Sequence, residues 1–114
     1  MKFRRITAII HADRLEEVEE VLLKLGVFGA SIAKVKAHGG YANFSGSGWL
    51  LSHVSIEIFI GQQRAEEIAQ AIMEVTHSGG KGDGIIAISP VETIYRIRTK
   101  EKYEYDACDL KSEI

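Results

Sequence analysis

Residues 54–76 read VSIEIFIGQQRAEEIAQAIMEVT, and this stretch holds a strand and a helix in direct succession. Every second residue from Val54 to Ile60 is a β-branched aliphatic residue, which predicts a strand. From about Gln62 to Thr76 the apolar residues recur at helical spacing instead, which predicts a helix with one apolar stripe. The stripe consists of Ile68, Ala71, Ile72 and Val75.

The beginning of the chain repeats this order. Phe3–His11 is rich in Ile and Thr and predicts a first strand. A helix follows, in which Asp13 is predicted as the N-cap and Glu16 as its capping-box partner, and which Gly26 ends. Its apolar stripe is formed by Leu15, Val18, Leu22 and Leu25.

Three further extended segments complete the pattern. Ala30–His38 predicts a second strand, and Ile85–Ser89 and Thr93–Arg98 predict two extended pieces that Pro90 separates, because proline cannot donate to a sheet ladder. The overall order predicts an α+β fold of the ferredoxin-like type, a βαββαβ sandwich with two helices on one face of an antiparallel sheet. We expect one domain over residues 1–99, followed by an acidic tail over residues 100–114.

Composition narrows the function classes. The chain has 114 residues, enough for one core, and 46% of them are hydrophobic and 26% charged, as in ordinary globular proteins. Its net charge of −2 gives no overall field that would favour nucleic acid. The single Cys108 excludes an intrachain disulfide, and no segment has the apolar length of a membrane span. These features favour a cytoplasmic protein without membrane insertion.

The run Ser78-Gly79-Gly80-Lys81-Gly82-Asp83-Gly84, called here the glycine loop, is the first candidate site. Glycines allow backbone amides to point inward at positive φ, as a phosphate cradle requires. Arg96 and Arg98 follow, and in an extended segment they would project from the same face and offer forked donors to phosphate oxygens. An ordinary helix-to-strand turn would also explain the glycines alone.

These residues carry a family resemblance. Gly82-Asp83-Gly84, Pro90-Val91-Glu92 and Arg96-Ile97-Arg98-Thr99 resemble the C-terminal signature of the PII signalling proteins, and Ile6–Ile10 and Leu15–Val18 agree with the family's N-terminal part. The resemblance covers about residues 3–100. It implies a non-enzymatic regulatory homotrimer that binds adenine nucleotide (ADP, AMP or ATP) in the clefts between subunits and uses no catalytic cofactor.

Residue roles follow from the same resemblance. Gly79, Gly80, Lys81, Gly82, Asp83 and Gly84 would form the phosphate loop, and Arg96 and Arg98 would meet the phosphates, at least one of them across the subunit boundary. Ser31 would lie near the adenine and Glu57 near the ribose. Gly39 would mark the base of the family's T-loop, here about residues 39–52.

Departures from the family pattern are equally informative. The lysine that usually follows Gly-Asp-Gly is Ile85 here, which makes ADP or AMP at least as suitable a ligand as ATP. Tyr41 and His53 replace a glutamine and a lysine that serve the family's magnesium–ATP–2-oxoglutarate site. The residues therefore indicate a nucleotide sensor without the usual 2-oxoglutarate apparatus.

The T-loop segment is shorter than is usual in the family and lacks its modified tyrosine motif. Tyr41, Phe44 and Trp49 supply aromatic side chains, which are common anchors at interfaces, although they could also fold onto the body. We expect this loop to bind a protein partner. The resemblance to PII-like relatives with reduced T-loops implies a membrane transporter or a carbon-assimilation component linked to bicarbonate or the carboxysome, with bicarbonate as a possible second ligand.

Two other functions stay open on the sequence alone. A metal-responsive trimer resembling the divalent-cation tolerance proteins would need converging His or Cys ligands, but His11, His38, His53 and His77 show no ligand spacing such as i, i+4. A small acylphosphatase-type enzyme would need a nucleophile and a base, and the sequence identifies neither. We therefore expect no metal site and no catalytic residues.

Overall fold

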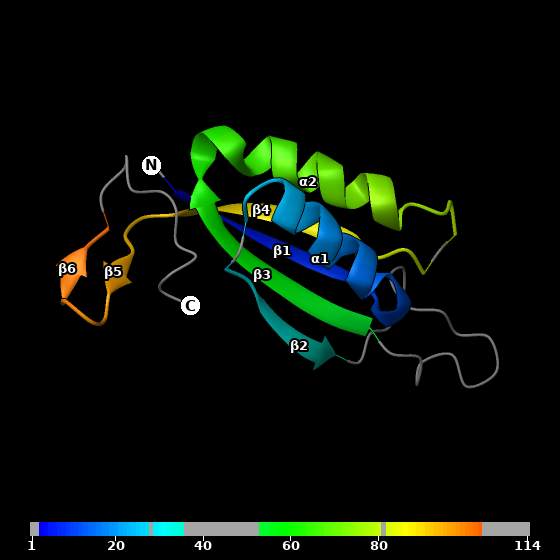
Figure 1. The fold of residues 1–114 in the computed structure, drawn as a ribbon, viewed down its shortest axis with the longest axis horizontal. Helices are drawn as coiled ribbons and strands as arrows, with labels where there is room; N and C mark the ends of the chain where they lie inside the picture. Colours follow the sequence, from blue (N-terminus) through cyan, green and yellow to red (C-terminus); the bar gives the residue numbers. More distant parts are fainter. Residues whose placement is uncertain (1–2, 28, 36–52, 81, 104–114) are drawn as a thin grey trace.

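The computed structural model describes residues 3–27, 29–35, 53–80 and 82–103, and it has the predicted ferredoxin-like architecture. The elements in chain order are β1 (Phe3–His11), the 3₁₀ turn η1 (Ala12–Arg14), α1 (Leu15–Lys24), β2 (Ser31–Val35), β3 (His53–Gly61), α2 (Gln62–Thr76), β4 (Ile85–Val91), β5 (Tyr95–Arg96) and β6 (Glu101–Lys102). The main sheet has the strand order β2-β3-β1-β4. Both helices cover the same face of this sheet (Figure 1).

The register of the central strands fixes which residues meet. β1 and β3 pair antiparallel over their whole length, from Phe3 opposite Gly61 to His11 opposite His53. β4 pairs with the other side of β1, and β2 pairs with β3, both antiparallel. The two ends of the β1–β3 ladder therefore bring sequence-distant residues together, including two histidines.

The core lies between the sheet and the helices. The alternating isoleucines that predict β3 point into it: Ile56 and Ile58 are almost fully buried, as are Ile6 and Ile10 on β1. Val18 on α1 and Ile68 and Ile72 on α2 complete the layer. Each such side chain stabilises the fold by about 1.5–3 kcal/mol relative to its exposed state.

The first helix begins differently from the sequence prediction. Asp13 lies inside η1, Arg14 occupies the N-cap position, and no side chain caps the helix, so the predicted Asp13–Glu16 capping box is wrong. The tight 3₁₀ turn uses the residues that the capping box would need. The predicted end is correct: Gly26 adopts a φ of +77°, and the amides of Gly26 and Val27 donate to Leu23 and Leu22 in a Schellman motif.

The prediction that Pro90 separates two extended pieces is wrong. β4 runs through it from Ile85 to Val91, and Pro90 lies opposite Arg4. β4 is an edge strand of the sheet, where a residue without an amide donor is tolerated. Pro90 therefore does not separate two extended pieces.

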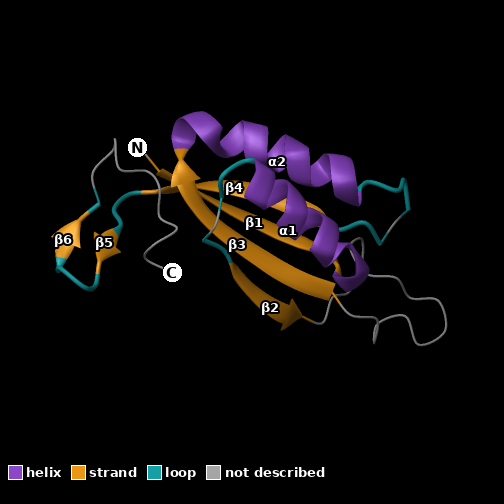
Figure 2. Cartoon of the chain, viewed as in Figure 1, coloured by secondary structure: helices purple, strands orange, loops and turns teal. Residues whose placement is uncertain are grey.

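The predicted strand Thr93–Arg98 is also wrong in extent. Only Tyr95–Arg96 is a strand, and residues 97–100 turn so that β5 pairs with β6 in a small hairpin. Lys100 closes the turn at a φ of +63°, and its amide donates to the Arg96 carbonyl. The domain boundary predicted after Thr99 falls inside this hairpin, which stands apart from the main sheet (Figure 2).

Candidate functional site

The glycine loop is held in shape by its own aspartate. The Asp83 carboxylate accepts hydrogen bonds from the amides of Ser78 (2.8 Å) and Gly79 (2.9 Å) and from the Ser78 hydroxyl. These bonds, that from the Ser78 hydroxyl first, lower the pKa of Asp83 from 3.8 to about 2. The Asp83 carboxylate is thus charged at neutral pH, and it occupies the donors at the start of the loop.

Two glycines of this loop adopt positive φ, for different reasons. Gly79 has a φ of +89° and nothing lies within 4 Å of the position that its Cβ would take. Gly84 has a φ of +106°, and a Cβ there would lie 1.8 Å from the Ile9 carbonyl oxygen of β1. Gly79 therefore serves the turn alone, whereas Gly84 also lets the chain pass against the central strand.

A pocket of about 290 Å³ adjoins the glycine loop. Ile10, Met73, Ile85 and Ile86 supply its apolar wall, and Glu74, His77 and Asp83 supply polar groups. Ile85, the residue in place of the family's lysine, is 46% exposed there. The pocket wall beside the glycine loop is consequently apolar at Ile85.

Ser31 and Glu57 are brought together by the sheet. They lie opposite each other in the β2–β3 ladder, and Thr7 of β1 lies on the other side of Glu57. An Arg5 guanidinium nitrogen is 3.8 Å from a Glu57 carboxylate oxygen, and both side chains are partly exposed. The two residues predicted to face the adenosine therefore share one surface of the main sheet.

Arg96 and Arg98 do not lie as the sequence predicts. Arg96 is the last residue of β5 and Arg98 lies in the turn, so the two do not alternate along one extended strand. The Arg96 guanidinium carbon is 4.3 Å from the centroid of the Tyr103 ring, and Tyr103 packs edge-on against Phe3. Because the chain turns after Arg96, the spacing of two residues does not place both arginines on one face of a strand.

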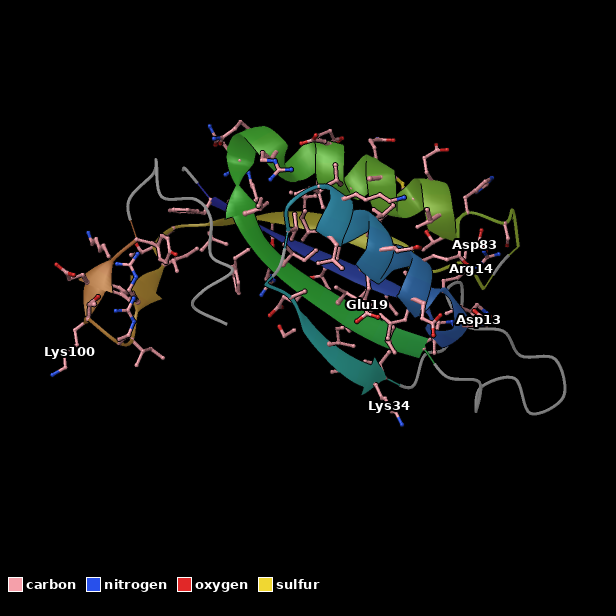
Figure 3. All side chains as sticks on the ribbon, in the orientation of Figure 1. Asp13, Arg14, Glu19, Lys34, Asp83 and Lys100 are labelled. Carbon is pink, nitrogen blue, oxygen red and sulfur yellow. The ribbon has the colours of Figure 1, made fainter. Side chains whose placement is uncertain are left out.

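Within one chain, the glycine loop and the arginine hairpin are far apart. The hairpin lies at one end of the elongated molecule and the loop at the other, as the labels on Lys100 and Asp83 show (Figure 3). The longest dimension is 49 Å, against 24 and 22 Å for the others. A single chain therefore does not combine the two halves of the predicted phosphate site.

Sequence reasoning missed a contact between β3 and the glycine loop. His53 is buried, its Nε2 lies 3.4 Å from the Gly82 carbonyl oxygen, and its ring lies against that of His11 with 4.6 Å between centroids. The β1–β3 register pairs the two histidines, so correct strand pairing would have revealed them. Among the described residues, no group of three or more His, Cys, Asp or Glu side chains could hold a metal ion.

Several predicted site residues lie outside the described ranges. They are Gly39, Tyr41, Phe44, Trp49 and Lys81, together with His38 and Cys108. None of the helices in the described part of the chain has the length and apolarity to cross a membrane.

Comparison with known proteins gives consistent matches. The family model for nitrogen regulatory protein P-II matches residues 3–101. A P-II protein of Azospirillum brasilense is 35% identical over 106 residues, which cover 87% of this chain and 95% of the relative. P-II 1 of Methanothermobacter thermautotrophicus is 34% identical, covering 86% and 91%. The crystal structure of Arabidopsis thaliana PII bound to citrate superposes with a TM-score of 0.73 at 30% identity, covering 90% of this chain and 87% of that one.

Proposed function

The chain belongs to the P-II family of nitrogen regulatory proteins, and we propose that it is a signalling regulator that senses adenine nucleotide in clefts between the subunits of a homotrimer. The observation that carries this proposal is the separation of the two halves of the site. The glycine loop and the arginine hairpin lie at opposite ends of the chain, so only a neighbouring copy can complete the cleft. The exposed surface of the hairpin supports such a contact, because Ile97 is 92% exposed and Tyr95 60%.

The proposed site residues have complementary roles in this cleft. The glycine loop, braced by Asp83, would present its remaining backbone groups and Lys81 to the phosphates. Arg96 and Arg98 of the adjacent copy would neutralise the phosphate charge through forked donors. Ser31 and Glu57, paired across β2 and β3, would contact the adenosine, with Gly39 beside it.

The ligand preference follows from Ile85. An apolar side chain at this position removes one cation from the triphosphate end, which reduces the advantage of ATP over ADP or AMP. We therefore propose ADP or AMP as ligands at least as good as ATP. Bicarbonate is a second candidate effector, and no catalytic cofactor is required.

The partner is proposed on the sequence of residues 39–52. Tyr41, Phe44 and Trp49 would anchor a protein target, either a membrane transporter or a carbon-assimilation component, and nucleotide occupancy would change the affinity for it. The protein would act in the cytoplasm, without membrane insertion and without nucleic acid. Deleting residues 44–49 should preserve ADP binding and abolish target capture; if target capture survives the deletion, this role of the loop is refuted.

The decisive experiment is the double variant Arg96→Ala/Arg98→Ala. Two charge-assisted contacts are lost, each worth about 1.5–3 kcal/mol, so ADP affinity should fall at least about a hundredfold in isothermal calorimetry. Arg14→Ala removes an exposed arginine that pairs with Glu17 at 3.4 Å, and it should leave ADP binding unchanged. Light scattering must show the same oligomer in all three proteins. Unchanged ADP binding in the double variant would refute the proposed site.

A further inference from the structure

His53 is buried at the first position of β3, with 1% of its surface exposed. It faces two different parts of the molecule. Its Nε2 lies 3.4 Å from the Gly82 carbonyl oxygen, while its ring lies at 36° to the His11 ring on the neighbouring strand. The side chain therefore contacts both the central strand pair and the glycine loop.

The hydrogen bond constrains the protonation of His53. A carbonyl oxygen only accepts, so Nε2 must carry the hydrogen of this bond. Nδ1 is buried and has no hydrogen-bond partner among the described residues. The Nδ1 of the neighbouring His11 lies 3.9 Å from a carboxylate oxygen of Asp13 and does not contact His53 Nδ1 through a hydrogen bond.

Three contacts hold consecutive residues of the loop. His53 holds the Gly82 carbonyl, Ser78 and Gly79 hold the Asp83 carboxylate, and the backbone of Gly84 lies against Ile9. The Asp83 bonds are internal to the loop, whereas the other two connect it to the sheet. Of these two, only the contact with His53 is made by a side chain.

We infer that His53 is a positioning residue for nucleotide binding: it fixes the Gly82 peptide against the end of the β1–β3 ladder, and the tilted His11 ring packs against it. This inference rests on the proposed nucleotide site. A bound phosphate needs a loop of fixed shape. The Gly82 carbonyl shares its peptide plane with the Asp83 amide, which donates to the Gly80 carbonyl at 3.3 Å, so the contact with His53 also holds the turn that joins Gly80 to Asp83. Without this link the loop must be ordered by the ligand, at a cost in affinity.

The test compares three variants in calorimetry with ADP. His53→Leu fills the buried position with an apolar side chain that has no hydrogen-bond donor. It should weaken ADP binding about tenfold, the equivalent of one hydrogen bond. His53→Gln carries an amide donor near the position of Nε2 and should restore most of the affinity. Ile58→Val, on the same strand and in the core, should lower the melting temperature and leave ADP affinity unchanged.

Wild-type affinity in His53→Leu would overturn the inference, as would a His53→Gln variant as weak as His53→Leu. A loss of affinity in Ile58→Val that matches its loss of stability would also overturn it, because the effect of His53 would then be one of folding alone.

A measurement without nucleotide separates this inference from the proposed function. In ¹⁵N NMR spectra of the free protein at neutral pH, His53 should be protonated at Nε2, and amides 82–84 should exchange faster in His53→Leu than in Ile58→Val. A His53 ring without a hydrogen on Nε2, or equal exchange rates, contradicts the link. If the wild type binds no ADP and these results hold, the proposed function fails and the link stands.

Discussion

At the scale of single residues, Asp83 decides the shape of the glycine loop. Its carboxylate accepts from two amides and one hydroxyl, and a charged acceptor makes such bonds stronger than a neutral one does. The loop is therefore built before any ligand arrives, and its first amides are not available to phosphate. In the proposed site, the ligand would meet the part of the loop that follows these amides.

Replacing Asp83 with Asn should lower stability in a pH-dependent way. The folded-state pKa of about 2 lies below the ordinary 3.8, so the stabilisation by Asp83 is present above pH 3.8 and is lost as the pH falls towards 2. Thermal melts of wild type and Asp83→Asn should differ at pH 7 and converge near pH 2. A constant difference across this range would contradict the assigned role of the charge.

The two positive-φ glycines of the loop provide a matched pair for mutation. Gly79→Ala meets open space and should cost only the backbone strain, about 1–2 kcal/mol. Gly84→Ala adds a clash with the Ile9 carbonyl and should cost about 3 kcal/mol or more. Urea unfolding measures both, and equal losses would mean that β1 yields to the added methyl group.

At the scale of elements, the hairpin depends on Tyr103. The ring is buried between Arg96 and Phe3, which connects β5 and β6 to the beginning of β1. This contact gives the arginine turn a defined position although only two residue pairs join the strands. A two-stranded hairpin of this size would not be stable alone.

Tyr103→Ala should lower stability by about 2 kcal/mol, the value of a buried aromatic ring in a small cluster. It should also increase amide exchange across residues 95–102, because the hairpin loses its attachment. Tyr95→Ala removes a ring that is 60% exposed and is the control, with little effect expected. Equal effects of the two substitutions would show that Tyr103 does not anchor the hairpin.

Hydrophobic periodicity correctly predicted the strands and helices that bury one apolar face. The predictions were wrong where a local turn interrupts the element. The isoleucine alternation of β3 and the stripe of α2 gave both elements almost to the residue, because burial imposes those periods. The predicted strand Thr93–Arg98 was wrong because residues 97–100 form a turn, which Lys100 closes at positive φ. The capping box failed because a 3₁₀ turn competes for Asp13.

At the scale of the whole molecule, the two halves of the predicted phosphate site lie at distant ends of the chain. The sequence motifs identified the glycine loop and the arginines, but not that 49 Å of elongated molecule keeps them from meeting within one chain. The His53–Gly82 contact could not be found either, since it depends on the register of β1 with β3. Distance along a sequence carries little information about such contacts.

Oligomers mixed from two variants, each defective in a different half of the proposed site, should therefore recover ADP binding. Arg96→Ala/Arg98→Ala disables the hairpin and Asp83→Ala disables the loop, so neither protein alone should bind ADP well. Unfolded, mixed and refolded together, they should form some clefts with both halves intact, and calorimetry should detect ADP binding at a reduced number of sites. Absence of binding in the mixture would contradict a site shared between subunits.

Pro90 has a consequence for the protein at high concentration. It lies in β4, which forms one edge of the four-stranded sheet, and it has no backbone amide hydrogen to donate. An edge interrupted in this way is a poor template for strand addition by a stray chain. Pro90 should therefore disfavour amyloid-like strand addition along that edge.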